Sequence, residues 1–104
     1  MKMVWAVVRW SKVEEIARRL KKIGVSGGTV CPVQGYGEEW HLYEPLIHGG
    51  HYKLEAIVEE DQVESVVKEI TEGASTGIEG DGVLTVFDLG KVVHIRTTKS
   101  AVRS

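Results

Sequence analysis

Two helical patterns, each lying between strand-like segments, constrain the fold of this chain more than any other feature. Before the first helix, Ser11 and Glu14 have the spacing of a capping box, in which each side chain satisfies the other residue's backbone N–H. Apolar side chains then recur at helical spacing up to Gly24, a natural residue at a helix C-terminus. Asp61 and Glu64 repeat the capping-box spacing before a second apolar series that stops near Gly73. The chain therefore contains two helices of similar design.

Runs of β-branched and aromatic residues flank both helices. They predict strands over 2–9, 28–35, 52–59 and 83–89, with a short tail strand over 92–96. The order β-α-β, loop, β-α-β predicts an α+β, ferredoxin-like βαββαβ sandwich, with a four-stranded antiparallel sheet and both helices on one face. The other face, which carries Trp and Val, is expected to pack against copies of the chain.

Composition limits the classes of protein to consider. The 104 residues correspond to one domain, residues 1–104, and a domain this small cannot enclose a large pocket, so a sizeable ligand is expected between subunits. Thirteen Lys and Arg against fifteen Asp and Glu argue against a nucleic-acid partner. We expect neither a membrane-spanning segment nor a signal peptide. The single cysteine, Cys31, excludes an intramolecular disulfide and fits the cytoplasm.

The glycine-rich segment 75–82 is the candidate binding motif. It contains Thr76-Gly77 and closes with Gly80-Asp81-Gly82, between the second helix and the last long strand. A hydroxyl, accessible N–H groups and little steric bulk are what a diphosphate-binding turn needs. Most glycine-rich turns are only turns, so the segment alone leaves both interpretations open.

The pattern as a whole resembles the PII signal-transduction family (GlnB/GlnK-like). The similarity covers nearly the full chain, including 24–27, 33–37 and 53–58. The family's C-terminal signature is matched in order by Thr76, Gly77, Gly80, Asp81, Gly82, Phe87, Asp88, Arg96 and Thr97.

This resemblance implies a homotrimer that binds adenine nucleotides in clefts between neighbouring subunits. Thr29 would face the adenine, the glycine turn would hold the phosphates, and a mobile T-loop would leave the sheet at Gly37. The nucleotide-binding residues implied in this way are Thr29, Gly37, Thr76, Gly77, Gly80, Asp81, Gly82, His94 and Arg96.

Several cations of the family pattern are absent from this chain. Val83 stands where the family has a lysine after Gly-Asp-Gly, His94 replaces the first tail arginine, and His51 replaces the lysine at the base of the T-loop. Glu38 and Glu39 occupy a basic position and a glutamine position. Each missing cation removes a charge-assisted hydrogen bond worth about 1.5–3 kcal/mol. We therefore expect ADP or AMP to be favoured over ATP, and no response to 2-oxoglutarate.

The T-loop, about residues 38–51, is shorter than the conventional one. Its residues Trp40, Leu42, Tyr43, Leu46 and Ile47 would form an anchor for a protein target such as a transporter or an enzyme, or would fold back as a small satellite core. The neighbours of Tyr43 are acidic and apolar, so uridylylation is not expected. Family members with reduced loops include ones tied to inorganic carbon, which makes bicarbonate a candidate second effector beside a nitrogen-regulatory role.

Three other interpretations compete with this one. A metal-binding, CutA-like trimer would use His41, His48 and His51, with Cys31, Glu38 and Glu39 as extra ligands. Nothing in their spacing enforces convergence, and no metal site is predicted. An interaction module with a degenerate nucleotide site also fits. An acylphosphatase on this fold needs an asparagine, and the chain has none. No catalytic residue and no enzymatic activity are predicted.

Overall fold

The computed structural model describes residues 1–33, 50–97 and 99–100 of the chain. The strands are β1 (Lys2–Arg9), β2 (Thr29–Val33), β3 (His51–Val58), β4 (Gly82–Asp88), β5 (Val93–His94) and β6 (Lys99–Ser100). The helices are α1 (Val13–Lys22) and α2 (Val63–Ala74), and each follows a single 3₁₀ turn, Trp10–Lys12 or Glu60–Gln62. The predicted helices and the four long strands are confirmed, with ends shifted by a residue or two where the structure describes them.

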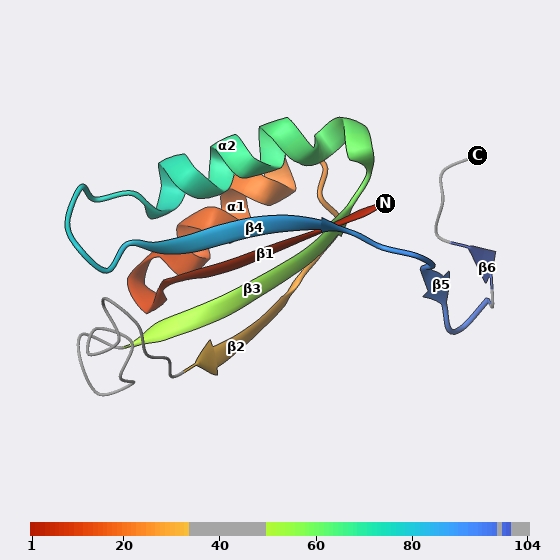
Figure 1. Cartoon of the computed structure of the whole chain (residues 1–104), viewed down its shortest axis with the longest axis horizontal. Coiled ribbons are helices and arrows are strands. Elements are labelled where there is room, and N and C mark those ends of the chain that lie inside the picture. The colour runs from red at the N-terminus through yellow and green to blue at the C-terminus, as the bar shows by residue number, and fades with distance from the viewer. Residues whose placement is uncertain (34–49, 98, 101–104) are drawn as a thin grey trace.

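Four strands form one antiparallel sheet in the order β2-β3-β1-β4. Strand β1 lies in the centre, where it pairs with β3 on one side and β4 on the other. Figure 1 shows α1 and α2 side by side over the same face of this sheet. The arrangement is the ferredoxin-like fold predicted from the order of the elements.

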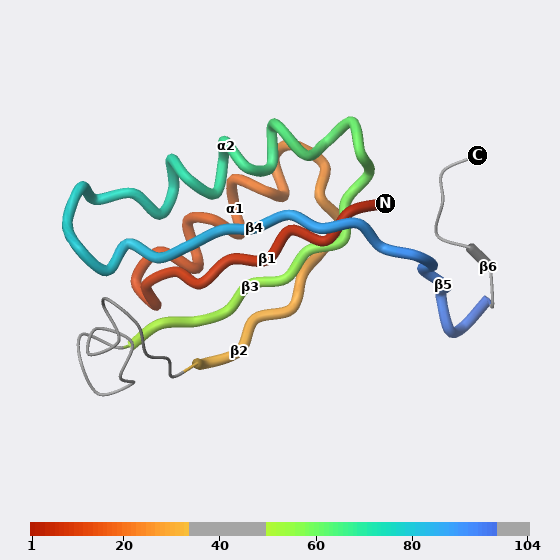
Figure 2. The backbone as a smooth tube through the Cα atoms, viewed as in Figure 1, coloured from red at the N-terminus to blue at the C-terminus, as the bar shows by residue number. Residues whose placement is uncertain are grey.

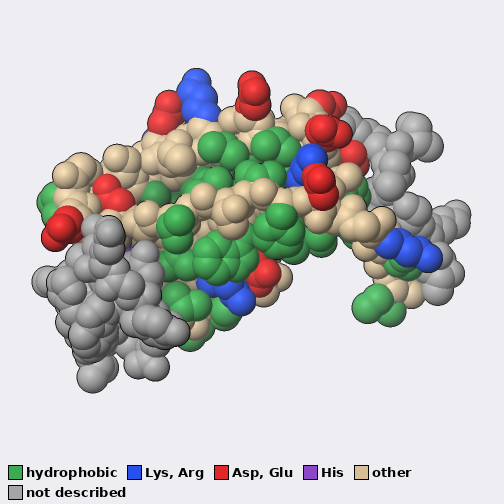
Figure 3. All heavy atoms as spheres, viewed as in Figure 1, with side chains coloured by type: hydrophobic (Ala, Val, Ile, Leu, Met, Phe, Trp, Pro, Cys, Tyr) green, Lys and Arg blue, Asp and Glu red, His purple; other side chains and the backbone are tan. Residues whose placement is uncertain are grey.

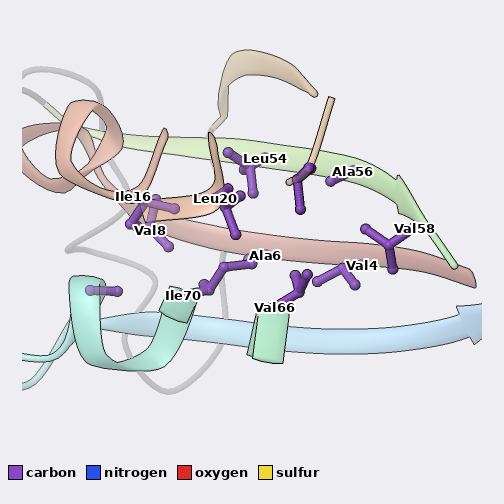
Figure 4. Packing of buried hydrophobic residues seen from close by; sticks show 12 residues of the cluster. Val4, Ala6, Val8, Ile16, Leu20, Leu54, Ala56, Val58, Val66 and Ile70 are labelled. Carbon is purple, nitrogen blue, oxygen red and sulfur yellow. The ribbon is translucent and has the colours of Figure 1, made fainter. Parts of the chain in front are cut away.

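The core lies between the sheet and the two helices. Alternate residues of β1, namely Val4, Ala6 and Val8, face the helices and are at most 2% exposed. Ile16 of α1 and Ile70 of α2 pack against them, as Figure 4 shows. This alternation of period 2 in the strands and period 3.6 in the helices is what made the elements predictable.

The opposite face of the sheet carries apolar side chains that neither α1 nor α2 covers. Cross-strand pairing places Met3 beside Ile57 and Phe87, and Val7 beside Val83, on this face. In the single chain, Ile57 is 41% exposed, Phe87 46% and Val83 52%. Figure 3 shows hydrophobic side chains gathered over the strands in this way. An uncovered apolar face of this extent is typical of a surface that packs against another subunit.

The helix starts differ from the predicted capping boxes. Ser11 lies inside the 3₁₀ turn before α1, and neither Arg9 nor Lys12, the N-cap residues, makes a side-chain cap. In the second unit the capping box joins Glu59 and Gln62, two residues earlier than Asp61 and Glu64. Both differences have one cause. A 3₁₀ turn precedes each α-helix, so the chain enters its helical conformation before the position that the pattern marks.

The tail differs from a single strand over 92–96. Only Val93–His94 is extended and pairs with Lys99–Ser100, and the chain turns at 95–97, where Thr97 N–H donates to the His94 carbonyl at 3.2 Å. Strands β5 and β6 lie beyond the end of β4, apart from the main sheet (Figures 1 and 2). Within the described part of the chain, no helix has the length and apolar character needed to cross a membrane.

Candidate functional site

The glycine-rich turn between α2 and β4 is built around the carboxylate of Asp81. Its Oδ2 accepts hydrogen bonds from the backbone N–H of Thr76 at 2.8 Å and of Gly77 at 3.0 Å. Its Oδ1 accepts from the Thr76 hydroxyl and from Arg9 Nε at 3.3 Å. The Thr76 hydroxyl in turn accepts from the Ile78 N–H at 3.2 Å. The Asp81 side chain is therefore the internal anchor of the turn.

These hydrogen bonds fix the charge state of Asp81. Its partial burial alone would raise the pKa, but the donors of Thr76, Gly77 and Arg9 outweigh it and lower the pKa to about 2. The carboxylate is ionised throughout the physiological range, and its acceptor oxygens point at groups of its own turn.

The backbone favours glycine at three positions of the turn. Gly77, Gly80 and Gly82 have φ angles of +78°, +93° and +118°, which side-chain-bearing residues rarely adopt. A Cβ atom on Gly82 would lie 1.8 Å from the backbone oxygen of Val7. The turn thus meets β1 in close backbone contact, and Gly82 belongs to the sheet as much as to the candidate site.

A second feature is an open cleft of about 640 Å³ where the segment before β2 faces the tail. Its walls include the backbone of Gly27 and Gly28, the start of β2 at Thr29, and β3 at Glu55 and Ile57. The tail segment Val92–His94 closes one side. A Cβ on Gly28 would lie 2.9 Å from the Glu55 carbonyl oxygen, so glycine is needed there for the backbones to approach.

The glycine turn and the cleft lie at opposite ends of the sheet. Gly82 is paired with Val8, whereas Asp88 is paired with Lys2 at the end from which the tail departs. Six residue steps along a strand correspond to about 20 Å. Figure 1 shows the turn after α2 and the β5–β6 tail at the two far ends of the molecule. One subunit therefore cannot bring its turn and its own tail to the same small ligand.

The predicted nucleotide-binding residues divide between these two places. Thr76, Gly77, Gly80, Asp81 and Gly82 form the turn, while Thr29 and His94 line the cleft. Arg96 is exposed in the tail turn next to the cleft strand β5 rather than within a strand. Gly37 and the proposed anchor residues Trp40, Leu42, Tyr43, Leu46 and Ile47 lie outside the described residues.

The metal alternative gains no support from the described residues. Among residues 1–33 and 50–97, no three His, Cys, Asp or Glu side chains are grouped as metal ligands. His51 is buried, 3% exposed, with its Nε2 2.7 Å from the Gly80 carbonyl oxygen. His41 and His48 lie outside the described residues.

Three contributions to the turn were not predicted from the sequence, and the contact of His51 Nε2 with the Gly80 carbonyl oxygen is one of them. Arg9 lies about seventy positions before the residues that it binds, so no local motif signals the contact. Asp81 was predicted as part of a phosphate-holding turn, and the structure shows that its carboxylate binds the turn itself. The five-residue spacing from Thr76 to Asp81, with a glycine after each, is the signal that could have indicated an internal hydrogen-bonded loop.

Comparison with known proteins identifies relatives along almost the whole chain. The family model for "Nitrogen regulatory protein P-II" matches residues 1–99. The chain is 38% identical to a nitrogen regulatory protein P-II homolog of Arabidopsis thaliana, over 90% of this chain and 52% of that protein, so it spans about half of that relative. It is 34% identical to nitrogen regulatory protein P-II 1 of Escherichia coli K12 and 33% identical to nitrogen regulatory protein P-II of Pasteurella multocida, each over 93% of both chains. The chain therefore belongs to the nitrogen regulatory protein P-II family.

Proposed function

We propose that this chain is a PII-like signalling protein of the cytoplasm that senses adenine nucleotides between the subunits of a homotrimer. Membership of the nitrogen regulatory P-II family gives it a regulatory role in signalling. Nucleotide occupancy would shift the population of T-loop states and so change the binding of a protein target, such as a transporter or an enzyme. No catalytic step is part of the proposal.

The separation of the two candidate half-sites carries this proposal. One end of each subunit presents the glycine turn, and the other presents the cleft at Thr29 together with the tail. A ligand that needs both must lie between two subunits, with the turn of one facing the cleft and tail of its neighbour. The uncovered apolar face with Val83 and Phe87 supplies a surface on which such subunits can associate.

The charges at the two half-sites favour a small number of phosphates. In the turn, Arg9 is already paired with Asp81, and Val83 follows the glycines in place of a lysine. In the tail, Arg96 supplies a guanidinium, and His94 stands where the family pattern has a second arginine. A triphosphate would exceed the available positive charge, so we propose that ADP or AMP binds more tightly than ATP.

Isothermal titration calorimetry of the purified protein with AMP, ADP and ATP tests this function. We expect binding of AMP or ADP, and ATP affinity lower by about tenfold or more, the equivalent of one missing charge-assisted hydrogen bond. Repeating the titrations with bicarbonate tests the link to inorganic carbon, because a bicarbonate-dependent affinity would favour carbon over nitrogen regulation. Absence of heat with all three nucleotides would overturn the sensor proposal.

The control variant must leave the sheet intact. A bulky residue at Gly82 would clash with the β1 backbone, so loss of binding in that variant would not isolate the ligand contact. Arg96→Gln is better placed, since Arg96 is exposed and the pairing of the main sheet does not include it. We expect this variant to keep its unfolding midpoint and to lose affinity for ADP more than for adenosine.

A further inference from the structure

Two side chains of the sheet, Arg9 and His51, hold the glycine turn from the same side. Arg9 is the last residue of β1 and His51 the first of β3, and they are direct cross-strand partners. Both therefore lie at the end of the sheet where Gly82 enters β4 opposite Val8. Neither residue belongs to the glycine motif.

The guanidinium of Arg9 donates hydrogen bonds to the turn. Its Nε donates to Asp81 Oδ1 at 3.3 Å, and its Nη2 donates to the carbonyl oxygen of Glu79 and to that of Ile78 at 3.5 Å. The side chain is only 20% exposed. Arginine suits this position because its rigid, forked donors can reach a carboxylate and carbonyl oxygens together, which a lysine ammonium does less well.

His51 holds the next peptide unit. Its ring is buried, 3% exposed, and Nε2 lies 2.7 Å from the carbonyl oxygen of Gly80. A carbonyl oxygen can only accept a hydrogen bond, so Nε2 carries the proton and donates. This is the position where the family pattern has a lysine, and the imidazole here is directed to the protein backbone.

The two contacts determine which way the peptide units of the turn face. In a trans peptide unit, the C=O and the following N–H point in opposite directions. With the carbonyls of Glu79 and Gly80 held by Arg9 and His51, the N–H groups of Gly80 and Asp81 face away from these two side chains. Gly80 is buried, whereas Asp81 is partly exposed, so the Asp81 N–H is the one of the two that a phosphate oxygen can reach, in the way that backbone N–H groups of turns bind anions.

We propose that Arg9 and His51 are positioning residues that fix the peptide orientation of the turn over residues 78–82 and thereby set its affinity for a phosphate-bearing ligand. The inference rests on the proposed function for the identity of the ligand, with ADP as the probe. In this scheme Arg9 Nε, Arg9 Nη2 and His51 Nε2 act on the turn itself and not on the ligand.

Paired variants at each position test the inference. His51→Leu removes the donor, and His51→Gln keeps an N–H near the same place. Arg9→Met removes the guanidinium, and Arg9→Lys keeps the charge without the fork. Arg18→Gln is the matched control, since Arg18 pairs with Glu14 on the exposed side of α1, away from the turn. Urea unfolding would verify that each variant is folded.

Two quantities are measured on each folded variant: amide hydrogen exchange at Gly77, Gly80 and Asp81 without ligand, and ADP affinity by calorimetry. We expect His51→Leu and Arg9→Met to exchange faster at the turn and to bind ADP about tenfold more weakly, the equivalent of one lost hydrogen bond. His51→Gln should recover most of the affinity, Arg9→Lys only part of it, and Arg18→Gln should match the wild type.

The outcomes separate this inference from the proposed function. Unchanged exchange in His51→Leu and Arg9→Met would overturn it, as would faster exchange with unchanged ADP affinity or a His51→Gln variant as weak as His51→Leu. If the wild type bound no nucleotide, the proposed function would fail. Faster turn exchange in the leucine and methionine variants would then still support the positioning role, and unchanged exchange would overturn that too.

Discussion

At the scale of single residues, Asp81 connects the sequence motif to the shape of the candidate site. Its carboxylate accepts from two backbone N–H groups, one hydroxyl and one guanidinium. Replacing it with asparagine removes the charge and half of the acceptor capacity. The motif Gly-Asp-Gly is therefore a structural unit first, and the ligand binding proposed for it depends on the backbone shape that Asp81 maintains.

Stability should respond to pH through Asp81. The pKa of its carboxyl is about 2 in the folded protein against an ordinary value of 3.8, so the folded state prefers the ionised form. Its contribution is complete above about pH 5 and is lost progressively as the pH falls through 4 towards 2. We expect the difference in unfolding free energy between wild type and Asp81→Asn to shrink over that interval, as measured by urea unfolding at each pH. A difference that stays constant from pH 6 to pH 2 would contradict the assignment.

Two glycines of the turn region should differ sharply in their tolerance of alanine. Gly77 has φ +78°, but a Cβ atom at this position would meet open space among the described residues, so Gly77→Ala should cost about 1–2 kcal/mol of backbone strain. Gly82→Ala adds a clash with the Val7 oxygen and should cost more, because the β1–β4 pairing must shift. Chemical denaturation of both variants measures this difference. Equal losses of stability would show that the backbone at Val7 moves to accommodate the added Cβ atom.

The residue scale also shows what the sequence could not indicate about the site. The glycines and Asp81 were predictable because their types and spacing mark a tight turn. The contacts of Arg9 and His51 were not, because they depend on the register of β1 against β3 and β4, which brings distant positions to one end of the sheet. Register is set by the packing of a whole face and leaves no local motif.

At the scale of elements, periodicity predicted the helices and strands well and their ends less well. The apolar faces of α1 and α2 and the alternate apolar residues of β1 are the buried positions of the core. The spacing of apolar residues in the sequence therefore shows these elements directly. The start of α2 depends on a 3₁₀ turn and on the capping box of Glu59 and Gln62. Asp61 and Glu64 have the same three-residue spacing, so spacing alone could not decide between the two pairs. The tail has no apolar alternation that specifies one partner, and its turn at 95–97 was not predicted.

The pairing of α1 with α2 should depend on one of two adjacent arginines. Arg19 lies between the helices, 3.1 Å from Glu69 and 3.5 Å from Glu72, and its side chain is 32% exposed. Arg18 pairs with Glu14 at 3.5 Å with both side chains mostly exposed. We expect Arg19→Ala to cost about 1–2 kcal/mol through lost packing and hydrogen bonding, and Arg18→Ala less than about 0.5 kcal/mol. Thermal unfolding of the two variants measures the contrast, and equal effects would refute it.

At the scale of the whole molecule, the uncovered face of the sheet predicts association. Val83 and Phe87 are about half exposed in the single chain and lie on the face opposite the helices. A charge at that face should be tolerated by the fold and should disrupt a trimer, because it would be buried without a partner. We expect sedimentation velocity to show a trimer for the wild type and smaller species for Val83→Glu. A wild-type monomer at micromolar concentration would contradict the proposed assembly.

The candidate site is divided between two ends of the sheet, so mixing two variants can distinguish a site shared between subunits from a site within one subunit. Asp81→Asn damages the turn, and Arg96→Gln damages the tail, so trimers of either variant alone should bind ADP weakly. In trimers assembled from equal amounts of both, an intact turn meets an intact tail at about one interface in four, if neighbouring subunits contribute one half each. Calorimetry on the co-refolded mixture should therefore recover about a quarter of the wild-type sites at wild-type affinity. A site contained within one subunit would give no recovery, because every subunit in the mixture carries one damaged half, and that result would reject the shared cleft.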